Sequence, residues 1–165
     1  MIVEVLAIGT ELLLGQIVNS NATRIGERLA DAGLDHYQQT VVGDNEARIV
    51  DALRGACSRA DAVIITGGLG PTRDDLTREA MARAAGIELV FDSVQEGALR
   101  ARWELRGRTM PDSNLRQAER PEGSTLIPNP KGTAPGIRML IDGTWVIALP
   151  GVPAEMIPML ENDVI

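Results

Sequence analysis

Aromatic side chains are scarce in this sequence, with two Trp, one Tyr and one Phe among 165 residues. The core must therefore be built from Val, Ile, Leu and Ala. Proteins that bind single-stranded nucleic acid stack the bases on aromatic side chains, and this chain offers few of them. A net charge of −7 at pH 7 points the same way, because an acidic surface repels the phosphate backbone. We expect no nucleic-acid partner.

Cysteine and histidine, the common ligands of transition metals, are nearly absent. Cys57 is the only cysteine, which excludes a disulfide within the chain, and His36 is the only histidine. A zinc site needs several such ligands, so this composition argues against a transition-metal centre. An oxygen-ligated cation such as Mg²⁺ remains compatible with the many Asp and Glu side chains.

Long apolar runs are missing as well. The first residues, Met1 to Val5, carry neither the basic region nor the apolar stretch of a secretory signal. No later segment approaches the ~20 apolar residues of a membrane span, so we expect a cytoplasmic protein with no membrane association. Hydrophobic residues make up 44% and charged residues 24% of the chain, a balance typical of one folded domain.

Short β-branched segments alternate with segments of helical periodicity in the first half of the chain. Gly, Asn and Asp separate them, and the periodic segments place apolar residues three or four positions apart. The expected strands are 3–8, 37–42 and 61–66, and the expected helices are 22–32, 47–58 and 75–85. This alternation predicts an α/β fold with a largely parallel sheet and helices on both faces.

The second half of the chain is less regular. We expect a helix over 93–106, a polar loop with a short helix over 107–121, and a strand at 124–127. Three prolines and two glycines make 128–136 an irregular loop. A hairpin follows over 137–149, and a last helix begins near Ala154. That helix meets no stop signal before Ile165, as expected for one domain, 1–165, cut from a longer protein.

A glycine-rich loop, Gly67-Gly68-Leu69-Gly70-Pro71-Thr72, follows the third expected strand. Glycines let the backbone approach a ligand and turn N–H groups toward an anion, and the next helix adds the positive end of its dipole. These are the properties of a phosphate site, although the loop is neither a Walker loop nor a dinucleotide-binding fingerprint. A tight connection between strand and helix explains the same glycines without a ligand.

Acidic residues lie beside this loop and after the other strands. Asp74 and Asp75 follow the loop directly, whereas Asp44 follows the second expected strand and Glu11 the first. Parallel strands end at one edge of a sheet, so these carboxylates should converge there. Because they would repel a phosphate unless a cation intervened, we interpret Asp75, with Asp74 or Asp44, as ligands of Mg²⁺ or as groups that position water. Glu11 is a candidate for positioning water. A helix cap or an exposed charge explains some of these acids equally well.

Two further segments are candidates for contact with a ligand. Asn129, Lys131, Gly132 and Thr133 combine a positive charge with a close backbone in the proline-rich loop, and Gly151 and Glu155 lie before and in the last helix. A stiff surface loop and ordinary helix capping explain the same residues. Six arginines between positions 100 and 120 are interleaved with glutamates, which is typical of a solvated face.

Four motifs, in order along the chain, resemble those of a known family. The segment Gly67 to Thr77 is similar to the signature loop of the MoaB/MogA-like molybdopterin-binding fold. Gly9 to Gly15 with Asn19-Ser20-Asn21, the loop 128–136 and the segment 149–156 resemble the N-terminal domain of the CinA competence/damage-inducible proteins. The resemblance covers essentially the whole chain.

This resemblance implies a three-layer α/β/α fold around a mixed, mostly parallel sheet. In the molybdenum-cofactor members, aspartates that correspond by motif position to Asp44 and Asp75 serve Mg²⁺-dependent nucleotide transfer to molybdopterin. The CinA domain is associated with hydrolysis of ADP-ribose and similar dinucleotide diphosphates, using divalent cations or a monovalent ion such as K⁺. A deamidase domain usually follows it. Members of the fold form dimers or trimers, so a homo-oligomer is expected.

Two functional hypotheses follow from the residues and the resemblance. One is a nucleotide pyrophosphatase that holds a diphosphate over 67–72, with Lys131 and Thr133 closing on it. In that enzyme Asp75, helped by Asp44 or Asp74, holds the cation that activates a water molecule. The other is a non-catalytic module that binds molybdopterin or a nucleotide. Both place a small molecule in the same cleft.

Overall fold

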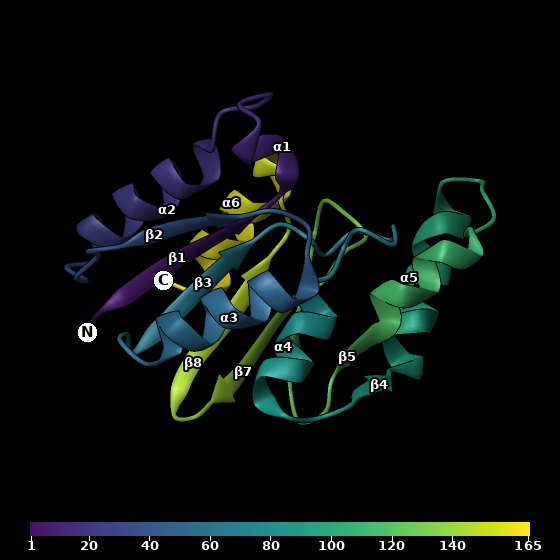
Figure 1. Ribbon diagram of the computed structural model, residues 1–165. Helices are drawn as coiled ribbons and strands as arrows, with labels where there is room; N and C mark the ends of the chain where they lie inside the picture. Colours follow the sequence, from purple (N-terminus) through teal and green to yellow (C-terminus); the bar gives the residue numbers. More distant parts are fainter.

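A six-stranded mixed sheet forms the centre of the molecule (Figure 1). The computed structural model describes all residues from Met1 to Ile165. The strands lie in the order β2-β1-β3-β8-β7-β6, where β1 is Val3–Ile8, β2 Gln39–Val42, β3 Ala62–Thr66, β6 Thr125–Ile127, β7 Gly136–Ile141 and β8 Thr144–Leu149. Strands β2, β1, β3 and β8 are parallel, and only β7 runs against its neighbours. The mixed, mostly parallel sheet is confirmed.

Helices cover both faces of this sheet and make three layers. On one face, α2 (Ser20–Asp31) and α6 (Pro153–Asp163) pack on a cluster that includes Ile64 and Leu149. On the other, α3 (Glu46–Cys57) and α4 (Thr77–Ala85) pack on a second cluster that includes Ile65. Successive side chains of β3 thus point to opposite layers, which is why its residues 62–65 are all apolar rather than alternating with polar ones.

A small lobe lies beside the main sheet, at the right of Figure 1. It contains α5 (Ser93–Leu105), the 3₁₀ helix η1 (Asp112–Ala118) and an antiparallel pair of strands, β4 (Leu89–Phe91) and β5 (Glu119–Pro121). Leu99, Met110 and Ala118 form its own small core. Neither here nor elsewhere is a helix long and apolar enough to cross a lipid bilayer.

The structure differs from the expected elements in the strands β4 and β5, the second of which lies in the expected loop 107–121, and at three helix starts. Helix α2 begins at Ser20 rather than at residue 22. An additional short helix, α1 (Thr10–Leu13), follows β1 directly. The helix expected from Asp75 begins at Thr77 instead, because the Asp75 carboxylate turns back to Thr72 rather than forward to cap the helix. Leu76 occupies the cap position without a side-chain hydrogen bond.

Candidate functional site

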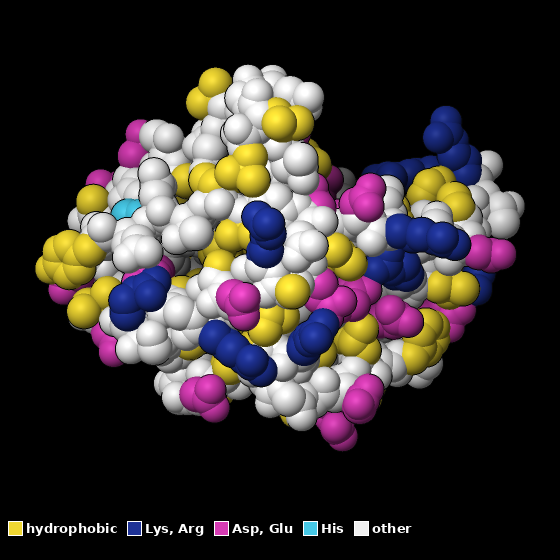
Figure 2. Space-filling view, viewed as in Figure 1, with side chains coloured by type: hydrophobic (Ala, Val, Ile, Leu, Met, Phe, Trp, Pro, Cys, Tyr) yellow, Lys and Arg dark blue, Asp and Glu magenta, His cyan; other side chains and the backbone are white.

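A cleft of about 650 Å³ opens where the parallel strands end, a volume typical of a small-molecule site. In Figure 2 the surface is hollowed between the main body and the lobe, and acidic side chains gather there. The predicted site residues that line the cleft are Glu11, Asp44, Gly67, Gly68, Leu69, Gly70, Pro71, Thr72, Asp74, Asp75, Thr133, Gly151 and Glu155. Asn129, Lys131 and Gly132 lie outside this lining. The expected convergence at the sheet edge is therefore present.

The carbonyl groups of Gly67, Gly68 and Leu69 in the glycine loop are held from the side of α4. The Gly67 carbonyl accepts a hydrogen bond from the Thr77 hydroxyl at 2.7 Å, and the Gly68 carbonyl accepts one from the Thr77 backbone N–H at 3.1 Å. The guanidinium of Arg78 donates to the Leu69 carbonyl. Thr77 and Arg78 are both buried, so these bonds are shielded from water.

The backbone N–H groups of residues 68–70 are consequently turned away from α4. In a trans peptide the N–H points opposite to the preceding carbonyl, and all three preceding carbonyls are bound on the α4 side. None of the three N–H groups donates to a backbone acceptor of the chain. Successive unpaired N–H groups that face one concavity form an anion-binding nest.

Two of the glycines are required by this backbone path. Gly67 has φ 102° and Gly68 has φ 67°, values that side-chain-bearing residues rarely adopt. A methyl group on Gly67 would collide with the Ile8 carbonyl, and one on Gly68 with the Thr77 hydroxyl. A tight connection and a ligand cradle both need glycine here, and the cradle in addition gives the free N–H groups a ligand to bind.

Arg78 places a positive charge beneath the same loop. Besides the Leu69 carbonyl, its guanidinium donates to the Gly70 carbonyl at 3.2 Å. Burial lowers the pKa of Arg78 to about 10, although the neighbouring Glu79 and Asp75 oppose that shift. The group therefore stays charged at neutral pH and favours an anion above the loop.

The Asp75 carboxylate is fixed through one of its two oxygens. Its Oδ2 accepts from the Thr72 backbone N–H at 2.8 Å and from the Thr72 hydroxyl at 2.6 Å. Gly70 leaves space for it, since a methyl group there would lie 2.5 Å from the same oxygen. Asp44 is held in a similar manner, with Oδ2 accepting from the Thr10 backbone N–H at 2.9 Å. Each carboxylate keeps its second oxygen for another partner.

Asp75 and Asp44 are better suited to share a cation with a bound phosphate than to form a complete metal site by themselves. No group of three or more His, Cys, Asp or Glu side chains in the chain is close enough together to hold a metal ion. Mg²⁺ commonly takes one or two carboxylates and completes its shell with phosphate oxygens and water. The donor chemistry of Asp75 and Asp44 is therefore suitable, and the metal role of Asp74, which is exposed at the cleft, stays a prediction.

Glu11 lies in the first turn of α1 and is exposed, which agrees with its interpretation as an exposed charge at a helix start. Its carboxylate folds back over Gly9, where a methyl group would lie 2.6 Å from Oε1. The residue lines the cleft, so its role in positioning water stays a prediction.

The proline-rich loop is organised by Asn129 rather than by a ligand. The side-chain oxygen of Asn129 accepts from the backbone N–H groups of Lys131 at 3.0 Å and Gly132 at 2.7 Å. Its amide nitrogen donates to Glu155 Oε2 at 2.7 Å. The N–H groups of Lys131 and Gly132 are therefore already used within the loop. Thr133, in contrast, reaches the cleft lining.

Three of the six arginines are not solvated, contrary to expectation: Arg120 donates to the Asp92 carboxylate and the Ser124 carbonyl, and Arg102 and Arg116 each donate to a loop of the cleft. Arg102 in α5 donates to three backbone carbonyl groups of the proline-rich loop, those of Asn129, Pro130 and Gly132. Arg116 in η1 donates to the backbone carbonyl groups of Thr72 and Asp75 in the glycine loop and to the Glu79 carboxylate. The lobe thus holds one loop with Arg102 and the other with Arg116. Arg106 and Arg108 are exposed as expected.

The start of α2 is a part of the cleft that the sequence reasoning did not assign. Asn19, Ser20 and Asn21 line it. Asn19 caps the helix by accepting from the Ala22 N–H at 3.3 Å, and Asn21 donates from Nδ2 to the Thr66 hydroxyl and the Gly151 carbonyl, each at 2.8 Å. The signal in the sequence that could have identified this part of the cleft is the motif Asn19-Ser20-Asn21. A helix cap explains Asn19 but not Asn21.

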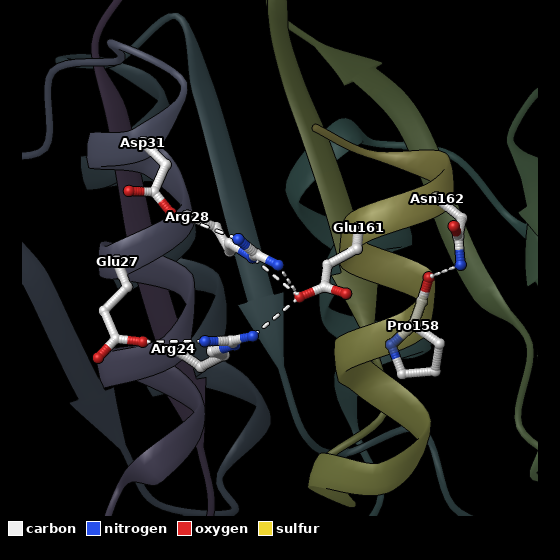
Figure 3. Close-up of polar contacts among 7 residues, drawn as sticks. All are labelled: Arg24, Glu27, Arg28, Asp31, Pro158, Glu161 and Asn162. Atoms are coloured by element: carbon white, nitrogen blue, oxygen red, sulfur yellow. Dashed lines mark hydrogen bonds and ion pairs between the residues drawn. The ribbon is translucent and has the colours of Figure 1, made fainter.

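An ion cluster ties together the two helices whose first turns border the cleft. Figure 3 shows Arg24 and Arg28 of α2 reaching across to Glu161 of α6. Glu161 Oε1 accepts from Arg24 Nη2 at 3.0 Å and from Arg28 Nε at 2.8 Å. The hydrogen bond from Arg28 lowers the pKa of Glu161 below its ordinary range.

Comparison with known proteins agrees with this architecture. The family model described as "Probable molybdopterin binding domain" matches residues 4–165. The crystal structure of the CinA protein from Thermoplasma acidophilum superposes with a TM-score of 0.90 at 37% identity, over 97% of this chain and 94% of that one. This chain belongs to the CinA family of molybdopterin-binding-like domains.

Other relatives show how much of a CinA protein this chain represents. A CinA-like protein from Frankia casuarinae is 52% identical over 167 residues, and a competence-damage inducible protein from Alkaliphilus metalliredigens is 48% identical over 162 residues. The chain spans 39% of the length of each. The molybdopterin biosynthesis enzyme MoaB from Thermus thermophilus shares the fold, with a TM-score of 0.65 at 22% identity over 97% of this chain and 87% of that one.

Proposed function

We propose that the cleft of this CinA domain binds a small molecule that carries phosphate groups, either a nucleotide or molybdopterin. The observation that carries this proposal is the set of unpaired backbone N–H groups at 68–70, which offer donors to phosphate oxygens. The buried Arg78 beneath them adds a charge of the required sign. The family description, a molybdopterin-binding domain, supports the same class of ligand.

Titration calorimetry with ADP-ribose, in the presence and absence of Mg²⁺, tests this binding function. Saturable binding that strengthens with Mg²⁺ is the expected result. A chain that binds neither ADP-ribose nor inorganic pyrophosphate while remaining folded contradicts the proposal.

Hydrolysis of an ADP-ribose-type diphosphate is the second candidate function, and the carboxylates favour it. Asp75 and Asp44 each keep one oxygen without a protein donor beside the N–H groups. Asp75 and Asp44 would hold a divalent cation, or K⁺ in its place, which would neutralise phosphate charge and lower the pKa of a bound water. The loop N–H groups stabilise charge that grows on the phosphoryl oxygens. Attack of water on phosphorus breaks the bridging P–O bond and yields AMP and ribose 5-phosphate.

An assay for AMP released from ADP-ribose separates the enzyme from the binding module. The enzyme forms AMP with Mg²⁺ or another divalent cation. A protein that binds ADP-ribose but releases no AMP with any cation is a binding module, for which molybdopterin is the competing ligand.

A further inference from the structure

The cleft is bordered by two loops that no hydrogen bond joins to each other. Thr72 and Asp75 of the glycine loop line the cleft, and so does Thr133 of the proline-rich loop. Apart from bonds to the lobe, the hydrogen bonds of each loop stay within it or run to the strands and helices beside it. The lobe is the one part of the structure that donates to both loops, through Arg102 and Arg116. It is therefore placed to make one loop depend on the other.

Arg102 supports the proline-rich loop from the side of the lobe. Its Nη1 donates to the Asn129 carbonyl at 2.7 Å and also to the Gly132 carbonyl, and its Nη2 donates to the Pro130 carbonyl at 2.5 Å. Hydrogen bonds from a charged donor are stronger than neutral ones. Prolines cannot donate backbone hydrogen bonds, so this loop, with its three prolines, makes few bonds of its own. Loss of the guanidinium would leave three carbonyl groups without their donor.

Arg116 supports the glycine loop at Thr72 and Asp75. Its guanidinium donates to the backbone carbonyl groups of both residues, to that of Asp75 at 3.2 Å. The same guanidinium pairs with the Glu79 carboxylate of α4, and the side chains of Arg116 and Glu79 are 25% and 24% exposed. A partly buried ion pair is screened less by salt than an exposed one, so this contact ties the lobe to α4 as well as to the loop.

The lobe that carries the two arginines has a core of its own. Trp103, which follows Arg102, and Leu115, which precedes Arg116, both pack against that core. Packed side chains resist displacement relative to one another, so the lobe transmits movement rather than absorbing it. Arg102 and Arg116 are therefore expected to move together when the lobe moves.

The chain enters and leaves the lobe at a single place. Glu88 precedes β4 and Glu122 follows β5, and the Glu122 N–H donates to the Glu88 carbonyl at 2.9 Å, where β5 also packs on α4. A body joined to the rest of a molecule at one place can turn about it unless other contacts hold it. The hydrogen bonds of Arg102 and Arg116 are such contacts. Without those of Arg102 the lobe is freer to turn, and turning shifts Arg116 relative to the glycine loop.

We propose that Arg102 is a positioning residue for the glycine loop, which it does not touch. It holds the lobe against the proline-rich loop, and the lobe in turn holds Arg116 on the carbonyl groups of Thr72 and Asp75. The path of the N–H groups at 68–70 then depends on both arginines. The effect on binding rests on the proposed function, because it takes these N–H groups to contact phosphate. The coupling of the two loops does not.

Hydrogen exchange of single amides, followed by NMR, tests the coupling in the free chain. The reporter is the Thr72 N–H, which is bonded within the glycine loop. Arg102→Ala should accelerate its exchange more than about 2-fold. The same substitution made in Arg116→Ala should accelerate it less than about 2-fold, because the link from lobe to loop is already cut. Arg100→Ala is the control, since Arg100 lies on the same helix and bonds to Glu96 within it. It should leave the rate unchanged.

Two results overturn the inference. One is a Thr72 N–H that exchanges in Arg102→Ala within about 2-fold of its rate in the unaltered chain, since the loops are then independent. The other is an acceleration that persists in Arg116→Ala, since the effect then does not pass through Arg116. If Arg102→Ala does not fold, Arg102→Lys replaces it in both comparisons, because an ammonium keeps the charge but lacks the planar fork that reaches three carbonyl groups.

Titration calorimetry with inorganic pyrophosphate and Mg²⁺ adds a binding readout. Arg102→Ala should weaken binding about 5-fold in the unaltered chain and less than about 2-fold in Arg116→Ala. Equal effects in the two backgrounds, including no effect in either, overturn the inference. An unaltered chain that binds no pyrophosphate contradicts the proposed function instead, and the exchange rates then decide the coupling by themselves. The two failures are therefore distinguishable.

Discussion

The Asp75 carboxylate is the residue on which catalysis can be tested most directly. In Asp75→Asn an amide oxygen can still accept from the Thr72 N–H and hydroxyl, so the loop should keep its shape while the charge is lost. We expect the rate of AMP release to fall on the order of 100-fold and the affinity for ADP-ribose to change far less. Steady-state kinetics and calorimetry measure the two quantities.

Asp142→Asn is the matched control for this exchange. Asp142 is exposed in the turn between β7 and β8, outside the cleft, and its φ of 49° suits Asn. Its activity should equal that of the unaltered chain. If Asp75→Asn hydrolyses ADP-ribose at the normal rate, the carboxylate has no part in the reaction.

Gly68 tests whether the backbone path of the loop matters. Gly68→Ala places a methyl group at φ 67° against the Thr77 hydroxyl, so it should lower both the affinity for ADP-ribose and the free energy of unfolding. Gly123→Ala has a similar φ of 73° but meets no atom within 4 Å. It should cost about 1 kcal/mol of stability and leave binding unchanged. Urea titration and calorimetry compare them, and equal binding by both variants contradicts the cradle.

At the scale of elements, the lobe matters because it holds both loops of the cleft. Arg116→Ala removes donors to the Thr72 and Asp75 carbonyl groups and should loosen the glycine loop. We expect about 10-fold weaker binding of ADP-ribose and faster amide exchange over 70–75. Arg108→Ala, an exposed arginine of the same lobe, is the control. Unchanged exchange and affinity in Arg116→Ala would mean that the loop holds its shape alone.

The ion cluster between α2 and α6 should make the thermal stability of the chain depend on pH. The pKa of Glu161 is lowered from 4.5 by the hydrogen bond from Arg28, so its contribution is complete above the unfolded value and is lost as pH falls through the lower folded value. The difference in Tm between the unaltered chain and Glu161→Gln should therefore be largest near neutral pH and shrink below pH 4.5. Thermal scans across this range measure it.

Glu27→Gln is the control for this pH dependence, because Glu27 is an exposed partner of Arg24 and does not bridge the two helices. Its Tm should follow that of the unaltered chain at every pH. A difference for Glu161→Gln that persists unchanged in acid would exclude the titration of Glu161 as the cause.

Elements with their own strong pattern could be predicted from sequence, and those defined by distant contacts could not. The strands β1 and β3 are buried throughout and almost entirely apolar, with Glu4 and Thr66 as the exceptions, because both faces are covered, and that pattern is visible in the sequence. Strands β4 and β5 have three residues each and pair only with one another, so no periodicity identifies them. Arg102 lies on a helix whose pattern indicates a solvated face, yet its partners are 27 to 30 residues further along the chain.

For the whole molecule, the exposed apolar residues at the end of α1 and in the loop that follows it bear on assembly. Leu13, the last residue of α1, and then Leu14, Ile17 and Val18 of the loop are 57%, 66%, 54% and 85% exposed. Adjacent exposed apolar side chains commonly mark an interface. We expect a homo-oligomer, a dimer or trimer, that buries this loop, and sedimentation velocity measures its mass.

Leu14→Asp should shift such an oligomer toward the monomer, because it places a charge in the interface. Val94→Asp changes an apolar residue of the lobe that is even more exposed than Leu14, and it should leave the mass unchanged. A chain that sediments as a monomer at all concentrations contradicts the expectation.

A recognition surface built from the peptide backbone cannot be erased by exchanging side chains. At positions 68–70 every genetically encoded replacement apart from proline keeps the main-chain N–H, so alanine scanning reports distortion of the backbone path and not loss of the hydrogen-bond donor. Chemical ligation that swaps one peptide nitrogen for an ester oxygen would delete a single donor and spare the rest. Inhibitors that match this surface should, for the same reason, be difficult to evade by point mutation.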